Sequence, residues 1–524
     1  MPMAAALNCS SSPSRNGTAS TAKPFELEEL SITDLGAAMR RGEYSARSIT
    51  ELYLERIEQI DRSGPALNSV IEVNPDALVM ADRLDEERRG GRTRGPLHGI
   101  PLLIKDNIDT ADRMSTTAGS LALQGSTART DAFVMQKLRE AGAVILGKTN
   151  LSEWANFRST RSTSGWSARG GQTLNPYALD RNPCGSSSGS GAAVAANLCA
   201  AAIGTETEGS IICPCSTNGI VGIKPTVGLV GRSGIIPIAH SQDTAGPMAR
   251  TVGDAAALLS AMAGLDPRDR ITNQGAGKAQ RDYTRFLDPD SMRGARIGVA
   301  RNYFGFHDRV DVLMEEAIEV MKELGAVLVD PADIESRGKY EGSGFEVLLY
   351  EFKDGINKYL ASVSDDVAVH SLCELIRFNE FHSEEEMPYF GQEIFHTALE
   401  KGDLSNPDYV NALHKVQRLS REEGIDATLR GRRLDAIVAP SAGPACLTDW
   451  INGDHFMGGS SAPAARAGYP SITVPAGFVH GLPVGISFFS KAYHEPVLIG
   501  LAHAYESATR HRRPPAFLPT VDFG

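Results

Sequence analysis

The feature that most restricts the fold is an uncharged stretch of 24 residues, 182–205. A stretch of this length could cross a membrane as a helix. It contains Asn182 and Pro183, however, followed by a Gly/Ser run from Gly185 to Gly191. Its apolar part, 192–203, carries mostly small side chains. We therefore expect a buried helix followed by a buried strand, and no membrane segment.

Strand and helix patterns alternate on the N-terminal side of this stretch. The short apolar runs 102–104 and 143–146 predict buried strands, and the pattern of 132–141 between them predicts a helix. Residues 49–60 carry apolar side chains at helical spacing, and a second helix is expected from Asn74-Pro75-Asp76 to Gly90-Gly91. Alternating strands and helices predict an α/β fold. Near the C-terminus we expect strands at 436–438, 471–474 and 484–489 and a helix from 497 to about 506.

The middle of the chain, about 265–430, has a different pattern. A helical stripe runs from Val310 to Leu324 and is closed by Gly325, a strand is expected at 327–329, and 345–360 and 409–429 look helical. We expect a largely helical elaboration on the sheet. Residues 1–24 are predicted to be a disordered tail, and 25–520 a single domain. The tail lacks a basic segment and a sustained apolar segment, so no signal peptide is expected and a soluble, cytoplasmic protein is favoured.

Composition excludes several classes of protein. Lys and Arg total 52 against 64 Asp and Glu, a net charge of −12, which argues against nonspecific nucleic-acid binding. The seven cysteines are odd in number and sparse, so a disulfide framework is not expected. Cys213 and Cys215 have no second ligand pair at zinc-site spacing, and the histidines show no metal-binding motif. We expect no metal, no cofactor, no membrane partner, and a monomer or homodimer.

Three separated segments contain candidate catalytic residues. Lys105 follows the strand predicted at 102–104, Ser186 lies in the Gly/Ser loop, and Ser210 follows a glycine turn in 204–211. Taken singly, each is typical of an ordinary surface, loop or capping residue. An alternative is a nucleophile elbow, because 185–189 matches G-x-S-x-G with Ser187 at its centre. An elbow needs a preceding strand, and the pattern of 180–184 predicts a turn.

Taken together and in order, these segments resemble the amidase signature family. The family's hallmarks are a G-x-P-x-x-x-K-D segment, a Gly/Ser loop and a G-T-[DE]-x-x-G-S segment, and the likeness extends over about 25–515. CGSSSGS, TETEGSI and KPTVGLV are most similar to bacterial peptide amidases. The resemblance implies the amidase signature fold, a large mixed central β-sheet covered by helices on both faces. Other matching segments are 224–226, 243–247, 469–477 and 481–485.

The resemblance also implies a Ser-Ser-Lys triad. Ser210 would be the nucleophile, and Ser186, held through a cis peptide bond in the family, would connect it to Lys105 as the base. Lys105 must be neutral to accept a proton, and burial lowers a lysine pKa. The implied reaction is hydrolysis of a carboxylic amide, foremost the C-terminal amide of peptides, to acid and ammonia through an acyl-enzyme. The oxyanion hole would consist of backbone N–H groups from Thr207, Glu208, Gly209 and Ser210.

Departures from the family pattern leave the substrate open. Glu208 stands in place of a glycine, Ile212 in place of an arginine and Cys184 in place of a glycine. The Glu208 side chain could face the leaving side of the substrate and repel an acid product, or be a solvated carboxylate at a helix start. Trp154 and Trp166 could line the substrate cleft or pack in the core. Two other functions stay open: the glutaminase subunit of a tRNA-dependent amidotransferase, and a noncatalytic docking protein on an amidase fold.

Overall fold

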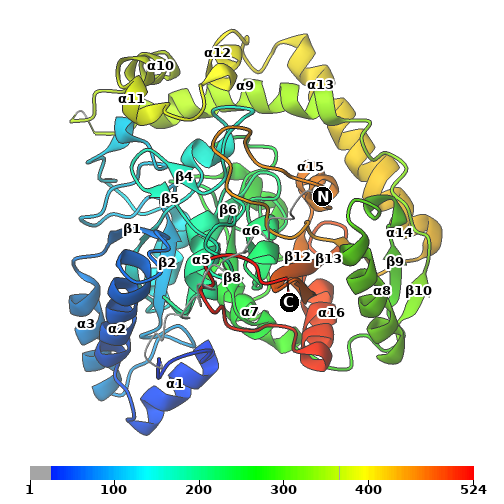
Figure 1. Cartoon of the computed structure of the whole chain (residues 1–524), viewed down its shortest axis with the longest axis horizontal. Helices are drawn as coiled ribbons and strands as arrows, with labels where there is room; N and C mark the ends of the chain where they lie inside the picture. The colour runs from blue at the N-terminus through cyan, green and yellow to red at the C-terminus, as the bar shows by residue number, and fades with distance from the viewer. Residues whose placement is uncertain (1–24, 365, 524) are drawn as a thin grey trace, which may run out of the picture.

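An 11-stranded mixed sheet forms the centre of the computed structural model, which describes residues 25–364 and 366–523 (Figure 1). The tail predicted for 1–24 lies outside the described residues. The pairs β2–β3, β2–β6, β9–β11 and β9–β10 are parallel, and the other neighbours are antiparallel. Helices cover both faces of the sheet, as the sequence predicted. The strand order is β1-β3-β2-β6-β8-β7-β12-β13-β11-β9-β10.

The uncharged stretch forms a buried helix and a buried strand, which confirms the prediction. Helix α5 (Ser188–Ala195) and strand β6 (Ala201–Glu206) have every residue buried. Small side chains allow α5 to pack against the sheet at close range: a Cβ at Gly189 would lie 2.3 Å from the carbonyl oxygen of Ser69. In the part of the chain that the structure describes, no helix is long and apolar enough to span a membrane.

The first half of the chain follows the predicted alternation. The predicted strands and the helix between them appear as β2 (Pro101–Lys105), α4 (Phe133–Glu140) and β3 (Val144–Thr149). One helix begins later than predicted, at Ala77 instead of Pro75, because the Asn74 side chain accepts the backbone N–H of Asp76 and holds a turn there. The remaining elements of this half are α1 (Ile32–Arg41), α2 (Ala46–Arg56) with a π-helical extension (Ile57–Arg62), β1 (Val70–Val73), α3 (Ala77–Arg89), β4 (Trp166–Ser167) and β5 (Gly171–Gln172).

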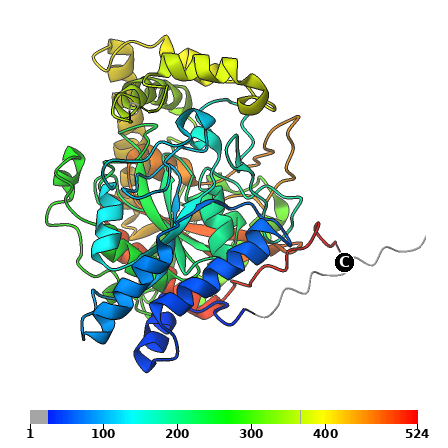
Figure 2. The same cartoon turned by 90° about the vertical axis from the view of Figure 1, so that its left-hand side faces the viewer.

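The segment 265–430 contributes both strands and helices. Strands β9 (Arg296–Val299) and β10 (Val327–Val329) extend one edge of the sheet beyond β11 (Ala436–Pro440). Helices α9–α13 form an arc along one side of the molecule, at the top of Figures 1 and 2. The helices of this segment are α8 (Asp308–Glu323), α9 (Glu341–Leu360), α10 (Leu372–Phe381), α11 (Ser383–Glu386), α12 (Glu393–Leu399), α13 (Pro407–Gln417) and α14 (Asp426–Arg432).

The C-terminal part returns to the sheet. The predicted strands are present as β11, β12 (Ser471–Val479) and β13 (Leu482–Phe489), followed by α16 (Glu495–Thr509). Their apolar residues join those of β2, β3 and β6 in the largest hydrophobic core. The elements between β6 and β9, and the helix before β12, are α6 (Ile212–Thr217), β7 (Val221–Lys224), β8 (Thr244–Ala249), α7 (Val252–Met262) and α15 (Ser461–Ala467).

Candidate active site

Two parallel neighbouring strands bring the lysine to the serines. Strands β2 and β6 pair with Ile104 opposite Ile203, so their carboxyl ends meet at one edge of the sheet. Lys105 ends β2, and its Nζ lies 2.8 Å from Ser186 Oγ, 2.9 Å from Thr205 Oγ1 and 3.3 Å from the Thr205 carbonyl oxygen. The structure thus joins Lys105 and Ser186, which are 81 positions apart in the sequence.

The loop that carries Ser186 is held against the end of β6. The Gly185–Ser186 peptide bond is cis. Ser187 donates its hydroxyl to the Thr205 carbonyl oxygen (3.1 Å) and accepts the Thr205 N–H (3.2 Å). A Cβ at Gly204 would lie 2.8 Å from Ser187 Oγ, so this approach requires glycine. Residues 182–187 contain no strand, so Ser187 is not at a nucleophile elbow and its hydroxyl serves the fold.

Ser210 lies in a turn that contacts this loop. The turn contains Gly209 at φ +77° and is held by Glu206, whose carboxylate accepts the N–H groups of Ile211 (2.8 Å) and Ile212 (3.0 Å). The Ser210 carbonyl oxygen accepts the N–H of Ser187 at 3.2 Å. The Ser210 residue is 8% exposed. Within residues 25–364 and 366–523, no protein acceptor takes the backbone N–H groups of residues 207–210, so all four are free to bind a ligand.

The Lys105 amine is in an environment that favours its neutral form. Burial lowers the pKa of Lys105 to about 7, and the charges of Glu206 and Asp243 offset only part of that effect. Lys148 and Lys224 are also fully buried, and burial lowers their pKa values too. Their amines contact backbone oxygens and a threonine hydroxyl, whereas the Lys105 amine contacts a serine hydroxyl. Contact with that serine, together with burial, distinguishes Lys105 as a candidate base.

Four residues around the site received no role from the sequence: Asn107, Thr205, Glu206 and Asp243. Asn107 donates to Thr205 Oγ1 at 3.0 Å and so fixes one partner of the lysine. Glu206 shapes the Ser210 turn. Asp243 accepts the Thr207 hydroxyl (2.5 Å) and two backbone N–H groups, and burial raises the pKa of Asp243 to about 6. Glu206 and Asp243 both lie inside motifs recognised in the sequence, but the pattern alone does not show what they contact.

A disulfide bond joins the two serine loops, which corrects the expectation from cysteine content. Cys184 and Cys213 are bonded, with Cα atoms 6.0 Å apart. Cys184 lies two residues before Ser186, and Cys213 lies three residues after Ser210. Low cysteine density argues against a framework of several disulfides but does not exclude one local bond. The four other cysteines of the described chain are free.

The Glu208 side chain forms an ion pair with Arg466 of α15, with 2.5 Å between Oε2 and Nη2. The interpretation of Glu208 as a solvated carboxylate at a helix start is therefore wrong, and α6 begins only at Ile212. The argument that Glu208 repels an acid product also weakens, because the Arg466 charge balances it. Burial raises the pKa of Glu208, and Arg466 opposes that rise.

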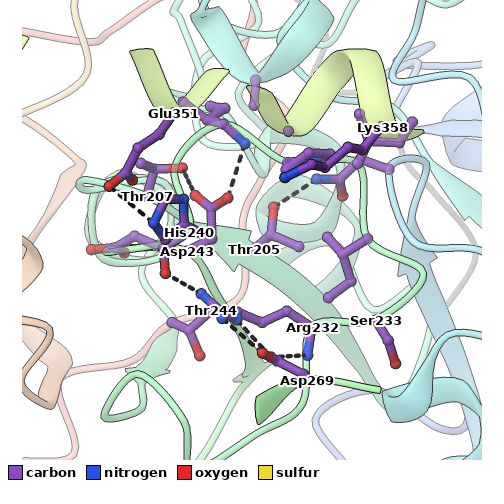
Figure 3. A pocket seen from close by; sticks show the side chains of 18 of the residues that line it. Thr205, Thr207, Arg232, Ser233, His240, Asp243, Thr244, Asp269, Glu351 and Lys358 are labelled. Atoms are coloured by element: carbon purple, nitrogen blue, oxygen red, sulfur yellow. Dashed lines mark hydrogen bonds and ion pairs between the residues drawn. The ribbon is translucent and has the colours of Figure 1, made fainter. Parts of the chain in front are cut away.

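Two cavities reach the serine loops. A cavity of about 280 Å³ is bounded by Gly185, Gly209, Glu208 and both disulfide cysteines, and its outer wall is formed by the 442–461 loop. A cavity of about 500 Å³ reaches Asn107, Ser186 and Thr205 and has a largely charged wall. In this larger cavity Asp243 faces Thr207, and Arg232 pairs with Asp269 (Figure 3).

Trp154 and Trp166 lie in packed clusters and line neither cavity. Trp154 is 2% exposed and packs edge-on against Phe395 of α12. Trp166 is 5% exposed and lies between Arg158 and the ring of Tyr389. Both tryptophans therefore support the helical segment from behind the site.

Comparison with known proteins shows the family. The Amidase family model matches residues 48–499. A probable amidase of Arabidopsis thaliana is 42% identical over 503 residues, covering 94% of this chain and 93% of that protein. A glutamyl-tRNA(Gln) amidotransferase subunit from Symbiobacterium thermophilum is 34% identical over 496 residues, covering 92% and 97%. The chain belongs to the amidase family.

Solved structures agree with this assignment. The crystal structure of native peptide amidase from Stenotrophomonas maltophilia has a TM-score of 0.90 and 52% identity, covering 94% of this chain and 100% of that one. A peptide amidase in complex with the competitive inhibitor chymostatin has a TM-score of 0.91 at the same identity and coverage. The fold is therefore the amidase signature fold, as the motifs implied, and the chain is an amide hydrolase.

The lowered pKa of Lys105 predicts how activity depends on pH. Only the neutral amine can take a proton, so kcat/KM should rise about tenfold per pH unit at low pH and level off above about pH 7. Lys105→Arg should lose at least about a hundredfold in kcat/KM, because guanidinium stays protonated. The control Lys224→Met removes another buried amine and should keep the midpoint. An active Lys105→Arg variant, or a flat profile from pH 5 to 9, would contradict this role.

The Cys184–Cys213 bond predicts a stability effect of reduction. It closes a loop of 29 residues, which corresponds to roughly 3 kcal/mol of unfolding free energy by chain entropy. The Cys184→Ser/Cys213→Ser variant should unfold at lower urea concentration than the wild type. Reductant should move the wild-type midpoint to that of the variant and leave the variant unchanged. Cys373→Ser, which removes a free thiol, is the control, and a double variant with the wild-type midpoint would refute the prediction.

Proposed function

We propose that this chain hydrolyses the C-terminal amide of peptides to acid and ammonia, with Ser210 as nucleophile, Ser186 as proton relay and Lys105 as base. The hydrogen-bond partners of Lys105 carry the proposal. A neutral amine has two N–H groups and one lone pair. The Thr205 carbonyl oxygen can only accept, and Thr205 Oγ1 already accepts from Asn107. When the amine donates to both oxygens of Thr205, its lone pair is left for the Ser186 hydroxyl.

The first half of the reaction forms the acyl-enzyme. Ser210 Oγ attacks the amide carbonyl carbon, its proton passes to Ser186 Oγ, and the Ser186 proton passes to Lys105 Nζ. The carbonyl oxygen becomes an oxyanion, which the free N–H groups of residues 207–210 would bind. When the C–N bond breaks, Ser186 returns a proton to the leaving nitrogen and recovers one from Lys105. Ammonia leaves, and the acyl group stays on Ser210.

The second half repeats these proton transfers with water. Water attacks the acyl carbon and gives its proton to Ser186, which passes one to Lys105. The ester bond then breaks, Ser210 regains its proton through Ser186, and the peptide acid is released. Lys105 ends neutral, ready for the next substrate. Each step uses the same Lys105–Ser186 contact, so no other base is needed.

The character of the smaller cavity supports a peptide amide as substrate. Much of its outer wall is uncharged, from Ala442 to Ala445 and at Phe456 and Met457, and the Glu208 charge is balanced by Arg466. Such a wall suits a neutral amide better than an anion. The 52% identity to a peptide amidase over nearly the whole chain supports the same class.

The two alternative functions have weaker support. The amidotransferase relative matches at 34% identity, below the value for the peptide amidase, and a glutaminase of that kind would need partner chains for its role. A noncatalytic docking protein has no need of a buried amine in contact with a serine, and such contacts cost stability. A purified single chain that hydrolyses peptide amides would argue against both.

The compartment and the oligomeric state stay predictions from the sequence. The disulfide weighs against a cytoplasmic location, because disulfides persist mainly in oxidising compartments. Monomer and homodimer are equally compatible with the proposed reaction, since Lys105, Ser186 and Ser210 all come from one chain.

A substrate panel tests the proposal. The purified chain should release ammonia from an N-acetylated dipeptide amide with kcat/KM at least about tenfold above that for glutamine, a fatty amide or an aryl amide. Ser210→Ala should lower that kcat/KM by at least about a thousandfold. Ser63→Ala, an exposed serine far from the site in the sequence, should match the wild type. Turnover of glutamine above that of the peptide amide would overturn the peptide assignment, and an active Ser210→Ala variant would overturn the mechanism.

A further inference from the structure

An exposed aromatic surface lies at the outer end of the smaller cavity. The loop between β11 and α15, which crosses the molecule in orange in Figure 1, exposes Trp450 (45%), Ile451 (92%) and Phe456 (62%). Large exposed apolar side chains are scattered over most proteins, but a cluster on one loop marks a binding surface. We call Tyr389, Trp450 and Phe456 the aromatic platform.

The platform is held in place by contacts on both sides. Tyr389, from the loop between α11 and α12, stacks on Trp450 with ring centres 4.7 Å apart and an interplanar angle of 19°. The other side of Tyr389 meets the edge of buried Trp166. The Trp450 indole donates to Gln172 Oε1 at 3.2 Å. These rings are therefore presented to solvent in a fixed arrangement, and little side-chain freedom would be lost on binding.

The platform is continuous with the catalytic cavity. Gln172, the partner of Trp450, also donates to the carbonyl oxygen of Ser164, and Ser164 lines the smaller cavity. Phe456 lines that cavity itself. Asp454, between the two platform residues of the loop, accepts the Ser164 N–H and the Asn182 amide, so the loop is tied to the cavity wall. A chain that leaves the cavity along this wall meets the platform next.

The size of the cavity decides which part of a substrate reaches the platform. At about 280 Å³, it is at the lower limit for enclosing a drug-sized ligand, so it holds the end of a peptide only. The residue before the amidated one must then lie at the mouth. Aromatic rings bind large apolar and aromatic side chains by area burial and by ring–ring contact.

We infer that the aromatic platform is a specificity site for the substrate residue immediately before the amidated one, and that it selects aromatic and large apolar side chains there. This rests on the proposed hydrolysis of peptide amides. Contacts far from the reacting bond raise kcat/KM for the substrates that make them. The platform should therefore sort peptides by sequence while the triad acts on every amide alike.

Matched substrates test the inference. Acetyl-Phe-Leu-amide and acetyl-Gly-Leu-amide differ only at the residue assigned to the platform, and leucine amide lacks that residue. The wild type should favour the Phe substrate over the Gly substrate by about tenfold or more in kcat/KM, the scale of one good aromatic contact. Trp450→Ala and Tyr389→Ala should each reduce the preference to within about threefold, with kcat/KM for acetyl-Gly-Leu-amide and leucine amide nearly unchanged.

A control variant and the pattern of outcomes separate a role in specificity from a role in self-association. Phe381→Ala removes a ring that is 84% exposed on α10 and lines neither cavity, and it should keep the wild-type preference. Equal turnover of the two peptide amides by the wild type, or an unchanged preference in both platform variants, would overturn the inference alone. Failure of the wild type to hydrolyse either peptide amide would overturn the proposed function and this inference with it. Loss of a dimer in Trp450→Ala by sedimentation, without a change in preference, would assign the platform to self-association instead.

Discussion

The removal of the Lys105 amine from water is the interaction on which the rest of the site depends. A pKa near 7 instead of 10.5 means that the site disfavours the ammonium form by roughly 5 kcal/mol. Two carboxylates lie near enough to oppose this, but each is engaged elsewhere. Glu206 accepts two backbone N–H groups of the Ser210 turn, and Asp243 accepts the Thr207 hydroxyl and two further N–H groups. In the described chain no carboxylate forms an ion pair with Lys105, which would otherwise hold it charged.

The same contacts that keep the amine neutral also place the serines. Thr205 accepts from the lysine and forms two hydrogen bonds with Ser187, so one residue of β6 fixes both the base and the Ser186 loop. The disulfide then ties that loop to the helix that follows Ser210. The catalytic groups come from rigid elements near the sheet edge, whereas the aromatic platform comes from long connections. Chemistry and substrate choice are thus carried by different parts of the chain.

The positions of Lys105 and Ser210 could be predicted because they depend on local pattern. A short apolar run predicts β2 and so places Lys105 at a strand end, and the small, uncharged stretch predicts α5 and β6 on either side of the serine loops. The Cys184–Cys213 bond and the Glu208–Arg466 ion pair could not be predicted in this way. Each joins segments whose meeting depends on how the loops pack, and neither spacing nor composition carries that information.

The pH dependence of Ser210 reactivity tests the central claim most directly. A fluorophosphonate that modifies the active serine needs no leaving ammonia and no added water, so its rate reports the activation of Ser210 alone. The account predicts that the second-order rate constant for labelling of Ser210 follows one ionisation near pH 7, and that this dependence disappears, at a far lower rate, in Ser186→Ala and Lys105→Ala. Labelling of Ser210 with the same rate and the same pH dependence in Lys105→Ala would contradict it.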